Sequence, residues 1–219
     1  MAKHLSLNTV IHAAVRRDLG RFNAALDAFP VGSKERAAEL EGAWQNLDKQ
    51  LYHHHHGEET IFWPALRELG ADTSLVSDLD GEHQRMAEAM AEVRTAMTTF
   101  AADPGEVQLT AVRAAFAELS TVIDTHFAHE EHDLEPMLAT ATETLQWKQA
   151  QRAIRRTMSL PEAGTYLAWL QDGADADARE YMSQEFPRPV LTIFPRLLGR
   201  QYTRRIASVW MGQAQNGRS

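Results

Sequence analysis

The sequence contains no cysteine, which excludes disulfide bonds and thiolate metal sites together. It also lacks any run of about 18 apolar residues, and its N-terminus lacks the basic and then apolar pattern of a secretory signal. The net charge of −8 argues against general nucleic-acid binding. We therefore expect a cytoplasmic protein with no transmembrane span and no nucleic-acid partner, in which any metal ion is held by nitrogen and oxygen donors.

One stretch of the sequence occurs twice, at residues 54–66 and again at residues 126–138. A histidine, a pair of glutamates, a proline and a leucine fall at the same positions in both copies. A further histidine precedes each copy at nearly the same distance, His12 by 42 residues and His83 by 43 residues. The repeat unit therefore has the length of a helical hairpin, and its fixed points are residue types that bind metal ions.

Apolar residues recur at three- and four-residue steps along four stretches, which predicts four amphipathic helices. We expect them over residues 5–29, from a cap at Ser33 to Gly70, from a cap at Thr73 or Ser74 to Phe100, and from an Asp103-Pro104 start to near residue 140. Short connections between long helices favour an all-α, antiparallel up-down-up-down four-helix bundle.

Within the run of four histidines at residues 53–56, only His54 continues an apolar stripe, and Glu58 follows it one turn later. His55 and Glu59 have the same spacing but are rotated about 100° around the helix. We therefore expect the other three histidines of the run at the surface or behind the ligands. Counting about 1.5 Å per residue from each turn brings the inward polar residues level. The expected metal ligands in this layer are His12, His54, Glu58, His83, His126 and Glu130.

Two buried glutamates without partners would cost several kcal/mol each. Two divalent cations would neutralise them and leave the histidines neutral and coordinating. Nitrogen and oxygen ligands shared by two ions, with two carboxylates able to bridge, suit iron or manganese better than four-coordinate zinc. The alternative is a buried network of histidine–glutamate hydrogen bonds, which would require both hairpins to have acquired matching polar layers.

Other residues are placed close to this layer. Asn8 lies one turn before the first of the histidines on the same face, where it can hydrogen-bond near the site. His129 is expected just behind the ligands, with His129 or a tyrosine left open as an additional ligand. Pro64 and Pro136 each follow an inward glutamate by six residues, which predicts matched helix kinks just beyond the site.

The repeat ends near residue 140, and the remaining chain has a different character. Prolines and glycines divide it into short helical pieces, and its apolar residues are too numerous for a free tail. We expect residues 1–140 to form the bundle and residues 141–219 to form a helical extension packed on it, with residues 213–219 disordered. Arginines beside apolar residues, at positions 196, 200, 204 and 205, leave open a contact with a protein or a membrane surface.

Through the paired histidine and Glu-Glu motifs and the upstream histidines, the chain resembles the hemerythrin-like, or HHE cation-binding, family over residues 5–140. The resemblance implies two non-haem iron ions joined by an oxo or hydroxo group. It also implies terminal ligands at His12, His54, His83 and His126, with Glu58 and Glu130 bridging. The chain departs from oxygen-carrying members of the family in two places. It has Ala87 where they have a second histidine on the third helix, and Glu130 where they have an aspartate at a longer spacing.

These departures argue against reversible oxygen transport and favour a reaction of the iron centre with O2, peroxide or NO. The leading hypothesis is a peroxide- or NO-consuming oxidoreductase with a role in oxidative stress. Two alternatives are a sensor of iron, oxygen or redox state whose extension changes its packing with the metal, and an oxygen store. The sequence has no nucleophile triad, phosphate-binding loop or Rossmann glycine pattern to support another class of enzyme.

Overall fold

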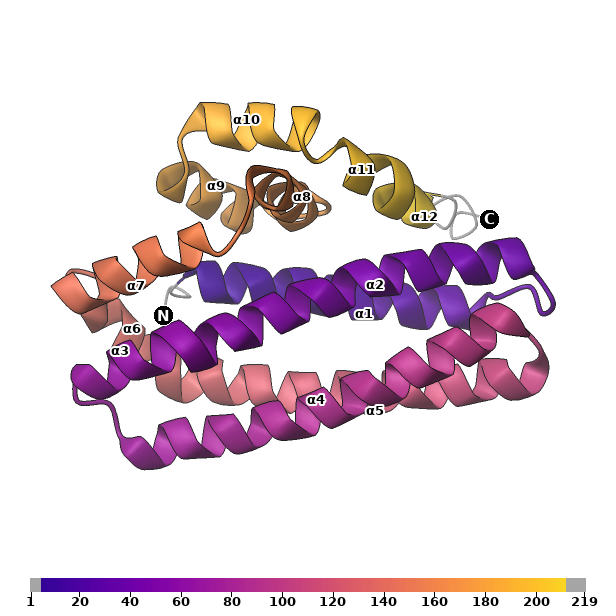
Figure 1. Cartoon of the computed structure of the whole chain (residues 1–219), viewed down its shortest axis with the longest axis horizontal. Helices are drawn as coiled ribbons and strands as arrows, with labels where there is room; N and C mark the ends of the chain where they lie inside the picture. The colour runs from indigo at the N-terminus through magenta and orange to yellow at the C-terminus, as the bar shows by residue number, and fades with distance from the viewer. Residues whose placement is uncertain (1–4, 212–219) are drawn as a thin grey trace.

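The computed structural model describes residues 5–211, and every regular element within that range is a helix. Four long helices run antiparallel to their neighbours in a bundle (Figure 1): α1 (Leu7–Asp27), α2 (Lys34–Gly57), α4 (Thr73–Ala102) and α5 (Glu106–His129). The predicted all-α up-down-up-down bundle is therefore confirmed. None of the described helices is long and apolar enough to cross a membrane. The segment predicted to be disordered, residues 213–219, lies outside the described residues.

Three of the long helices begin at side chains that accept free N–H groups of the first turn, and Ser6 does so for α1. Ser33 caps α2 as predicted, accepting from the Arg36 N–H at 3.3 Å. The prediction of Thr73 or Ser74 as the next cap is wrong. Asp72 holds that position, because its carboxylate reaches the Ser74 N–H at 2.8 Å.

The predicted start of the fourth helix at Asp103-Pro104 is also wrong. Asp103 ends α4 with φ −140° and ψ 89°, outside the helical region that a residue before proline disfavours, and α5 begins only after Gly105. The Pro104 carbonyl instead accepts a hydrogen bond from the Gly32 N–H at 2.8 Å. This bond ties together the two connections at this end of the bundle.

Both copies of the repeat leave the α-helix at the same place. One-turn π-helices follow α2 and α5, η1 (Glu58–Phe62) and η2 (Glu130–Leu134), and lead into the short helices α3 (Trp63–Glu68) and α6 (Glu135–Ala141). A proline stands in the first turn of each short helix, where it cannot donate to the preceding turn. The matched irregularities expected at these prolines therefore take the form of π-helical turns, each starting at a buried glutamate of the repeat.

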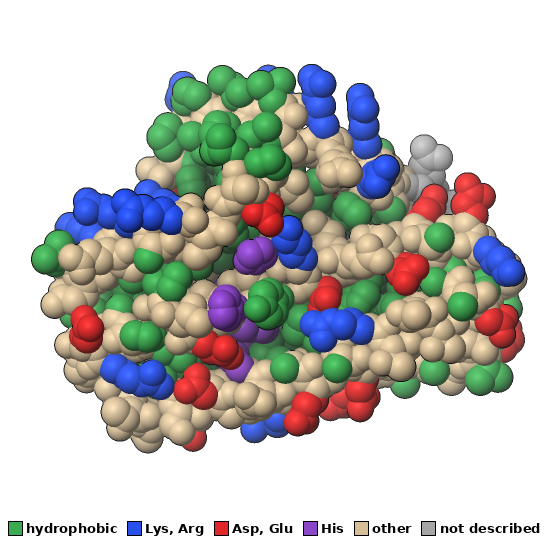
Figure 2. All heavy atoms as spheres, viewed as in Figure 1, with side chains coloured by type: hydrophobic (Ala, Val, Ile, Leu, Met, Phe, Trp, Pro, Cys, Tyr) green, Lys and Arg blue, Asp and Glu red, His purple; other side chains and the backbone are tan. Residues whose placement is uncertain are grey.

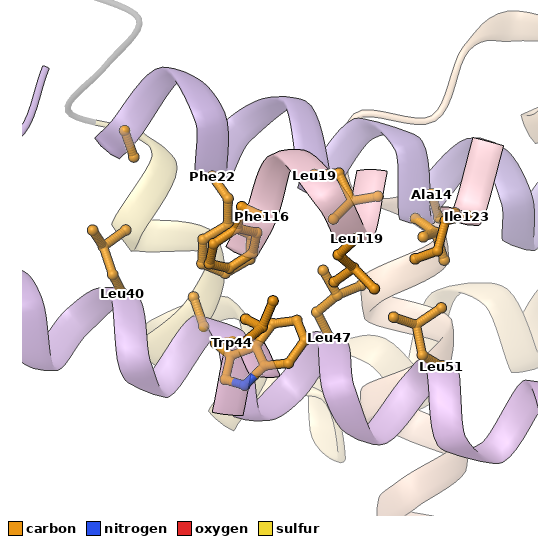
Figure 3. Packing of buried hydrophobic residues seen from close by; sticks show 14 of the residues in the cluster. Ala14, Leu19, Phe22, Leu40, Trp44, Leu47, Leu51, Phe116, Leu119 and Ile123 are labelled. Atoms are coloured by element: carbon orange, nitrogen blue, oxygen red, sulfur yellow. The ribbon is translucent and has the colours of Figure 1, made fainter. Parts of the chain in front are cut away.

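Apolar side chains of α1, α2 and α5 interdigitate in the bundle core (Figure 3). Phe22 stacks on Phe116 with ring centroids 4.6 Å apart. Trp44 packs edge-on against the Phe116 ring, with a centroid distance of 5.4 Å. Aromatic pairs in these arrangements stabilise a core beyond their area of burial. This packing fixes the relative heights of the helices, and so it also fixes which polar residues of the repeat face one another.

The rest of the chain lies across α1 and α2 (Figure 1). Its helices are α7 (Leu145–Arg156), α8 (Leu160–Gln171), α9 (Ala176–Glu185), α10 (Arg188–Leu197), α11 (Arg200–Tyr202), η3 (Thr203–Ala207) and α12 (Ser208–Met211). Trp169 and Trp210 belong to the same buried apolar cluster as the bundle core. The bundle and helices α8, α9, α11 and α12 therefore share one hydrophobic interior, whereas Trp147 of α7 packs in a second cluster with Trp63 and Leu66.

A buried carboxylate also joins α8 to α1. Asp18 is only 2 % exposed, and it accepts a hydrogen bond from Trp169 Nε1 at 2.8 Å. Arg17 and Arg21 lie 2.9 Å and 3.2 Å from the other oxygen of the same carboxylate. The charge of Asp18 is therefore paired and its oxygens are bonded, as a buried carboxylate requires.

Asp172, at the end of α8, accepts hydrogen bonds from Arg21 and from the Tyr202 hydroxyl, each at 2.8 Å. Burial by itself would raise the pKa of Asp172, but these two donors and the charge of Arg17 outweigh it and hold the pKa below the ordinary value of 3.8. The folded-state pKa is thus lower than the unfolded-state pKa. The ionised carboxylate therefore stabilises the fold fully at pH values above the unfolded-state pKa. This contribution is lost as the pH falls through the folded-state pKa.

We expect Asp172→Asn to lower the free energy of unfolding at about pH 7 and to have a progressively smaller effect below about pH 4. Asparagine keeps the shape of the side chain but removes the charge that pairs with Arg21. Urea unfolding of both proteins across this range measures the difference. A deficit of equal size at both ends of the range would contradict the assignment.

Candidate metal centre

All six predicted ligands meet in one layer of the bundle, and a seventh residue joins them. Their nitrogen and oxygen atoms form two groups, within each of which the donor atoms lie inside 4.8 Å of one another. The first group contains His12, His54 and Glu130, and the second contains His55, Glu58, His83 and His126. The level placement expected from counting residues is thus what the structure shows.

Each glutamate faces one histidine of each group. The Glu58 oxygens lie 3.5 Å from His54 Nε2 and 3.6 Å from His83 Nε2, and the Glu130 oxygens lie 3.1 Å from His12 Nε2 and 3.7 Å from His126 Nε2. The two oxygens of one carboxylate therefore point to different groups. This is the placement that a carboxylate needs to contact two neighbouring cations.

Several donor atoms of this layer are buried without a hydrogen-bond partner among the described residues: His54 Nε2, His55 Nε2, Glu58 Oε2 and Glu130 Oε1. Buried polar atoms are nearly always paired in proteins, because an unpaired one loses its hydration without compensation. Cations coordinated by these lone pairs, one in each group, would satisfy all of them. The residues present therefore fit bound metal ions.

The electrostatics of the layer point the same way. Burial, followed by the negative charges of Glu130 and Glu59, raises the pKa of Glu58 well above its ordinary value. Burial, followed by the neighbouring imidazoles, lowers the pKa of both His54 and His55 well below the ordinary value. Without a cation the layer thus resists holding Glu58 ionised, while His54 and His55 are neutral, which is the state in which imidazole binds metal.

The second glutamate of each Glu-Glu pair holds a histidine of the opposite half of the bundle. Glu131 lies 3.1 Å from His12 Nδ1, and Glu59 lies 3.0 Å from His83 Nδ1. A carboxylate on Nδ1 fixes the tautomer and orientation of the ring and leaves Nε2 free as a metal donor. These contacts explain why the repeat carries two glutamates where the inward layer uses one.

Glu82 orients the His126 ring in the same way, through its Nδ1 atom. One of its oxygens lies 2.9 Å from His126 Nδ1 and the other lies 3.0 Å from His129 Nδ1. His129 therefore stands behind the layer, one contact further out than His126, and it belongs to neither group of donors. Glu82 was not anticipated from the sequence, because it follows no motif and only the packing of α4 against α5 brings it to His126.

We expect Glu82→Gln to lower the affinity for metal by roughly 10- to 100-fold, the usual cost of losing a carboxylate that orients a histidine ligand. Glutamine can keep one hydrogen bond but not the negative charge that strengthens the donor atom of His126. Competition with a chelator measures the change. Glu88→Gln, at an exposed position of the same helix, is the control, and equal affinities for the two variants would contradict the role of Glu82.

The expectation for His55 is wrong. It is buried with its ring against His83, at a centroid distance of 4.5 Å, and it does not lie at the surface or behind the ligands. The missed signal was its spacing from Glu58, because residues three apart on a helix share a face as residues four apart do. Of the rest of the histidine run, His53 is half-buried and His56 is exposed.

Two other expectations concern the edge of the layer. Asn8 Nδ2 donates to Glu130 Oε2 at 3.3 Å, as its place on α1 predicted. Tyr52 is exposed, so it is no donor to either group. Figure 2 shows several histidine side chains at the surface of this face of the molecule.

The chain beyond residue 140 covers one side of this layer. A side-chain carbon placed on Gly57 would lie only 2.6 Å from Ile154 Cδ1, so glycine lets α7 pack directly against the end of α2. Trp147 of α7 meets Phe62 of η1 with ring centroids 4.9 Å apart. The helix α7 is thus packed against the π-turn that carries Glu58.

Comparison with known proteins gives one family. The profile of the hemerythrin HHE cation binding domain matches residues 9–138, and a second, overlapping match covers residues 79–180. No curated protein and no solved structure matches the chain significantly.

Proposed function

Because the chain belongs to the hemerythrin HHE cation-binding domain family, we propose that its histidine–glutamate layer binds two iron ions and reacts with O2, peroxide or NO. The proposed activity is that of a peroxide- or NO-consuming oxidoreductase in the cytoplasm. Residues 1–140 would supply the di-iron bundle, and residues 141–219 would be an extension that covers it.

The observation that carries the proposal is the pair of neighbouring donor groups, each of which contains one carboxylate that also faces the other group. Each group offers at least two imidazoles and one carboxylate, and Glu58 and Glu130 each reach toward both groups. A single ion would leave one group of buried donors unpaired. Two ions would use both groups, and the two glutamates would offset part of the added positive charge.

The donor set favours iron because it combines imidazole and carboxylate and contains no thiolate. When bound, iron would supply a redox-active metal able to exchange electrons with a small oxidant. The residues of the chain bind, orient and shield this centre. Glu131, Glu59 and Glu82 orient three of the histidines, and the apolar core below the layer excludes bulk water from one side.

The test is loading with ferrous iron followed by metal analysis, absorption spectra and assays with excess peroxide or NO. We expect two iron ions per chain, a near-ultraviolet charge-transfer band, and consumption of many equivalents of one oxidant per site. Zinc-loaded protein is the matched control, because zinc can occupy nitrogen and oxygen donors without redox chemistry. Bleaching that stops after one equivalent of oxidant would contradict the enzymatic proposal and leave storage or sensing.

A second candidate function, a sensor of metal or redox state, is favoured by the contact of α7 with η1. A change in the ligand position of Glu58 would reach Phe62 and Trp147 through one helical turn. Limited proteolysis of metal-free and iron-loaded protein tests this function. We expect different cleavage rates beyond residue 140 if the protein is a sensor, and identical digestion patterns would exclude that role.

The exposed apolar side chains Ile193 and Leu197 of α10 support a further proposal about partners. With the arginines at positions 196, 200, 204 and 205, we propose that they contact a protein or a membrane surface. Sedimentation with anionic vesicles tests the membrane alternative.

A further inference from the structure

His55 occupies a place in the metal layer that the repeat does not explain. Its side chain is buried, and its Nε2 atom has no hydrogen-bond partner among the described residues. One of its ring nitrogens lies within 4.8 Å of donor atoms of Glu58, His83 and His126. A buried imidazole with a free lone pair among three other donors calls for a function beyond packing.

The two halves of the bundle differ at this position. Residue 55 follows the first repeated histidine, and Phe127 follows the second. Phe127 stacks on His12, with ring centroids 3.7 Å apart and 7° between the planes. His55 lies against His83, the counterpart of His12, at 4.5 Å and 37°. The two positions are equivalent in the repeat, but only the histidine adds a nitrogen donor.

Helix geometry explains how two consecutive histidines reach the same layer. Glu58 follows His54 by four residues and His55 by three, and both spacings bring side chains together on one helical face. His54 therefore reaches the group that contains Glu130, while His55 reaches the group that contains His83. The His54 and His55 rings lie with their centroids 5.3 Å apart, and each belongs to a different donor group.

We propose that His55 is a ligand of the metal ion on the His83–His126 side, an assignment that rests on the proposed two-ion site. The two ions are then held unequally, one by three histidines and the other by two. Additional imidazole donors strengthen the binding of divalent transition metals. The position with three histidines is therefore filled first and emptied last.

The test uses cobalt(II) as a spectroscopic probe of the full-length, metal-free protein. We expect wild-type protein to bind two cobalt ions with distinguishable affinities. His55→Phe reproduces the Phe127 arrangement, and we expect it to lower the tighter affinity at least tenfold, since even the loss of a group that orients a ligand costs about 10- to 100-fold. It should also change the visible spectrum of that ion. His56→Phe, at the exposed neighbouring position, should leave both affinities unchanged.

Wild-type X-ray absorption gives a second reading that needs no variant. Five imidazoles shared by two cobalt ions support the assignment, and four overturn it. If wild type binds two ions while His55→Phe keeps both affinities and the spectrum unchanged, His55 is not a ligand and the two-ion site stands. If wild type binds no second ion, the proposed two-ion site fails, and the assignment of His55 fails with it.

Discussion

Glu130→Gln is expected to reduce the iron retained by the protein at least tenfold and to affect both metal positions. The reason is geometric, because the two oxygens of Glu130 face His12 in one donor group and His126 in the other. Glutamine has nearly the same size, but it has only one oxygen and no negative charge to offset the cations. Loss of a direct ligand should cost at least the roughly 10- to 100-fold found for the groups that orient ligands.

Two further variants sharpen this experiment. His12→Ala removes a donor from one group alone, so we expect it to weaken one metal position and leave the other occupied. Glu118→Gln, at an exposed position of α5, is the matched control and should retain the wild-type content. Metal is measured per chain after anaerobic loading and desalting, with circular dichroism to verify helix content. Full iron content in Glu130→Gln would refute the bridging role of this carboxylate.

Asp18→Ala is expected to lower the free energy of unfolding by about 2–4 kcal/mol, the largest effect on stability that we predict for a residue outside the metal layer. Asp18 accepts from the fully buried Trp169 and pairs with Arg17 and Arg21. Alanine leaves the Trp169 N–H without this acceptor and removes the carboxylate that both guanidinium groups share. Because the two arginines remain partly exposed, solvent offsets part of the cost.

Asp48→Ala is the control for this prediction. Asp48 pairs with Arg94 at 2.7 Å, but the arginine side chain is 45 % exposed. Surface ion pairs of this kind contribute about 1 kcal/mol or less. Urea unfolding of metal-free protein measures both variants, and the same loss in each would show that Asp18 does not join α8 to α1 as the structure indicates.

Much of the metal layer could be predicted from the sequence, because helical periodicity is a local property. The repeat of His54 with Glu58 and His126 with Glu130 shows which residues share a face, and counting residues from the turns shows which are level. His55 escaped this reasoning because the stripe was given one inward residue in this turn, His54, although His55 lies three residues before Glu58 and shares its face. In the last turn of α2, two consecutive residues contribute to the layer.

The carboxylates behind the histidines could not be predicted, and two of them come from the opposite half of the bundle. Glu131 reaches His12 and Glu59 reaches His83 only because the two hairpins pack against each other in one relative orientation. Glu82 has no place in the repeat at all. Its counterpart in the first half is Ile11, so the pattern itself would predict no carboxylate there.

The sequence by itself therefore determined the helices, their inward faces and six of the seven residues in the metal layer, since all of these follow from spacing along one chain. Tertiary structure alone decided the seventh residue, the carboxylates behind the histidines, and the position of α7 against η1 and the end of α2. The physical reason is that periodicity specifies direction around a helix axis, whereas contacts between helices depend on the packing of whole side chains across the core.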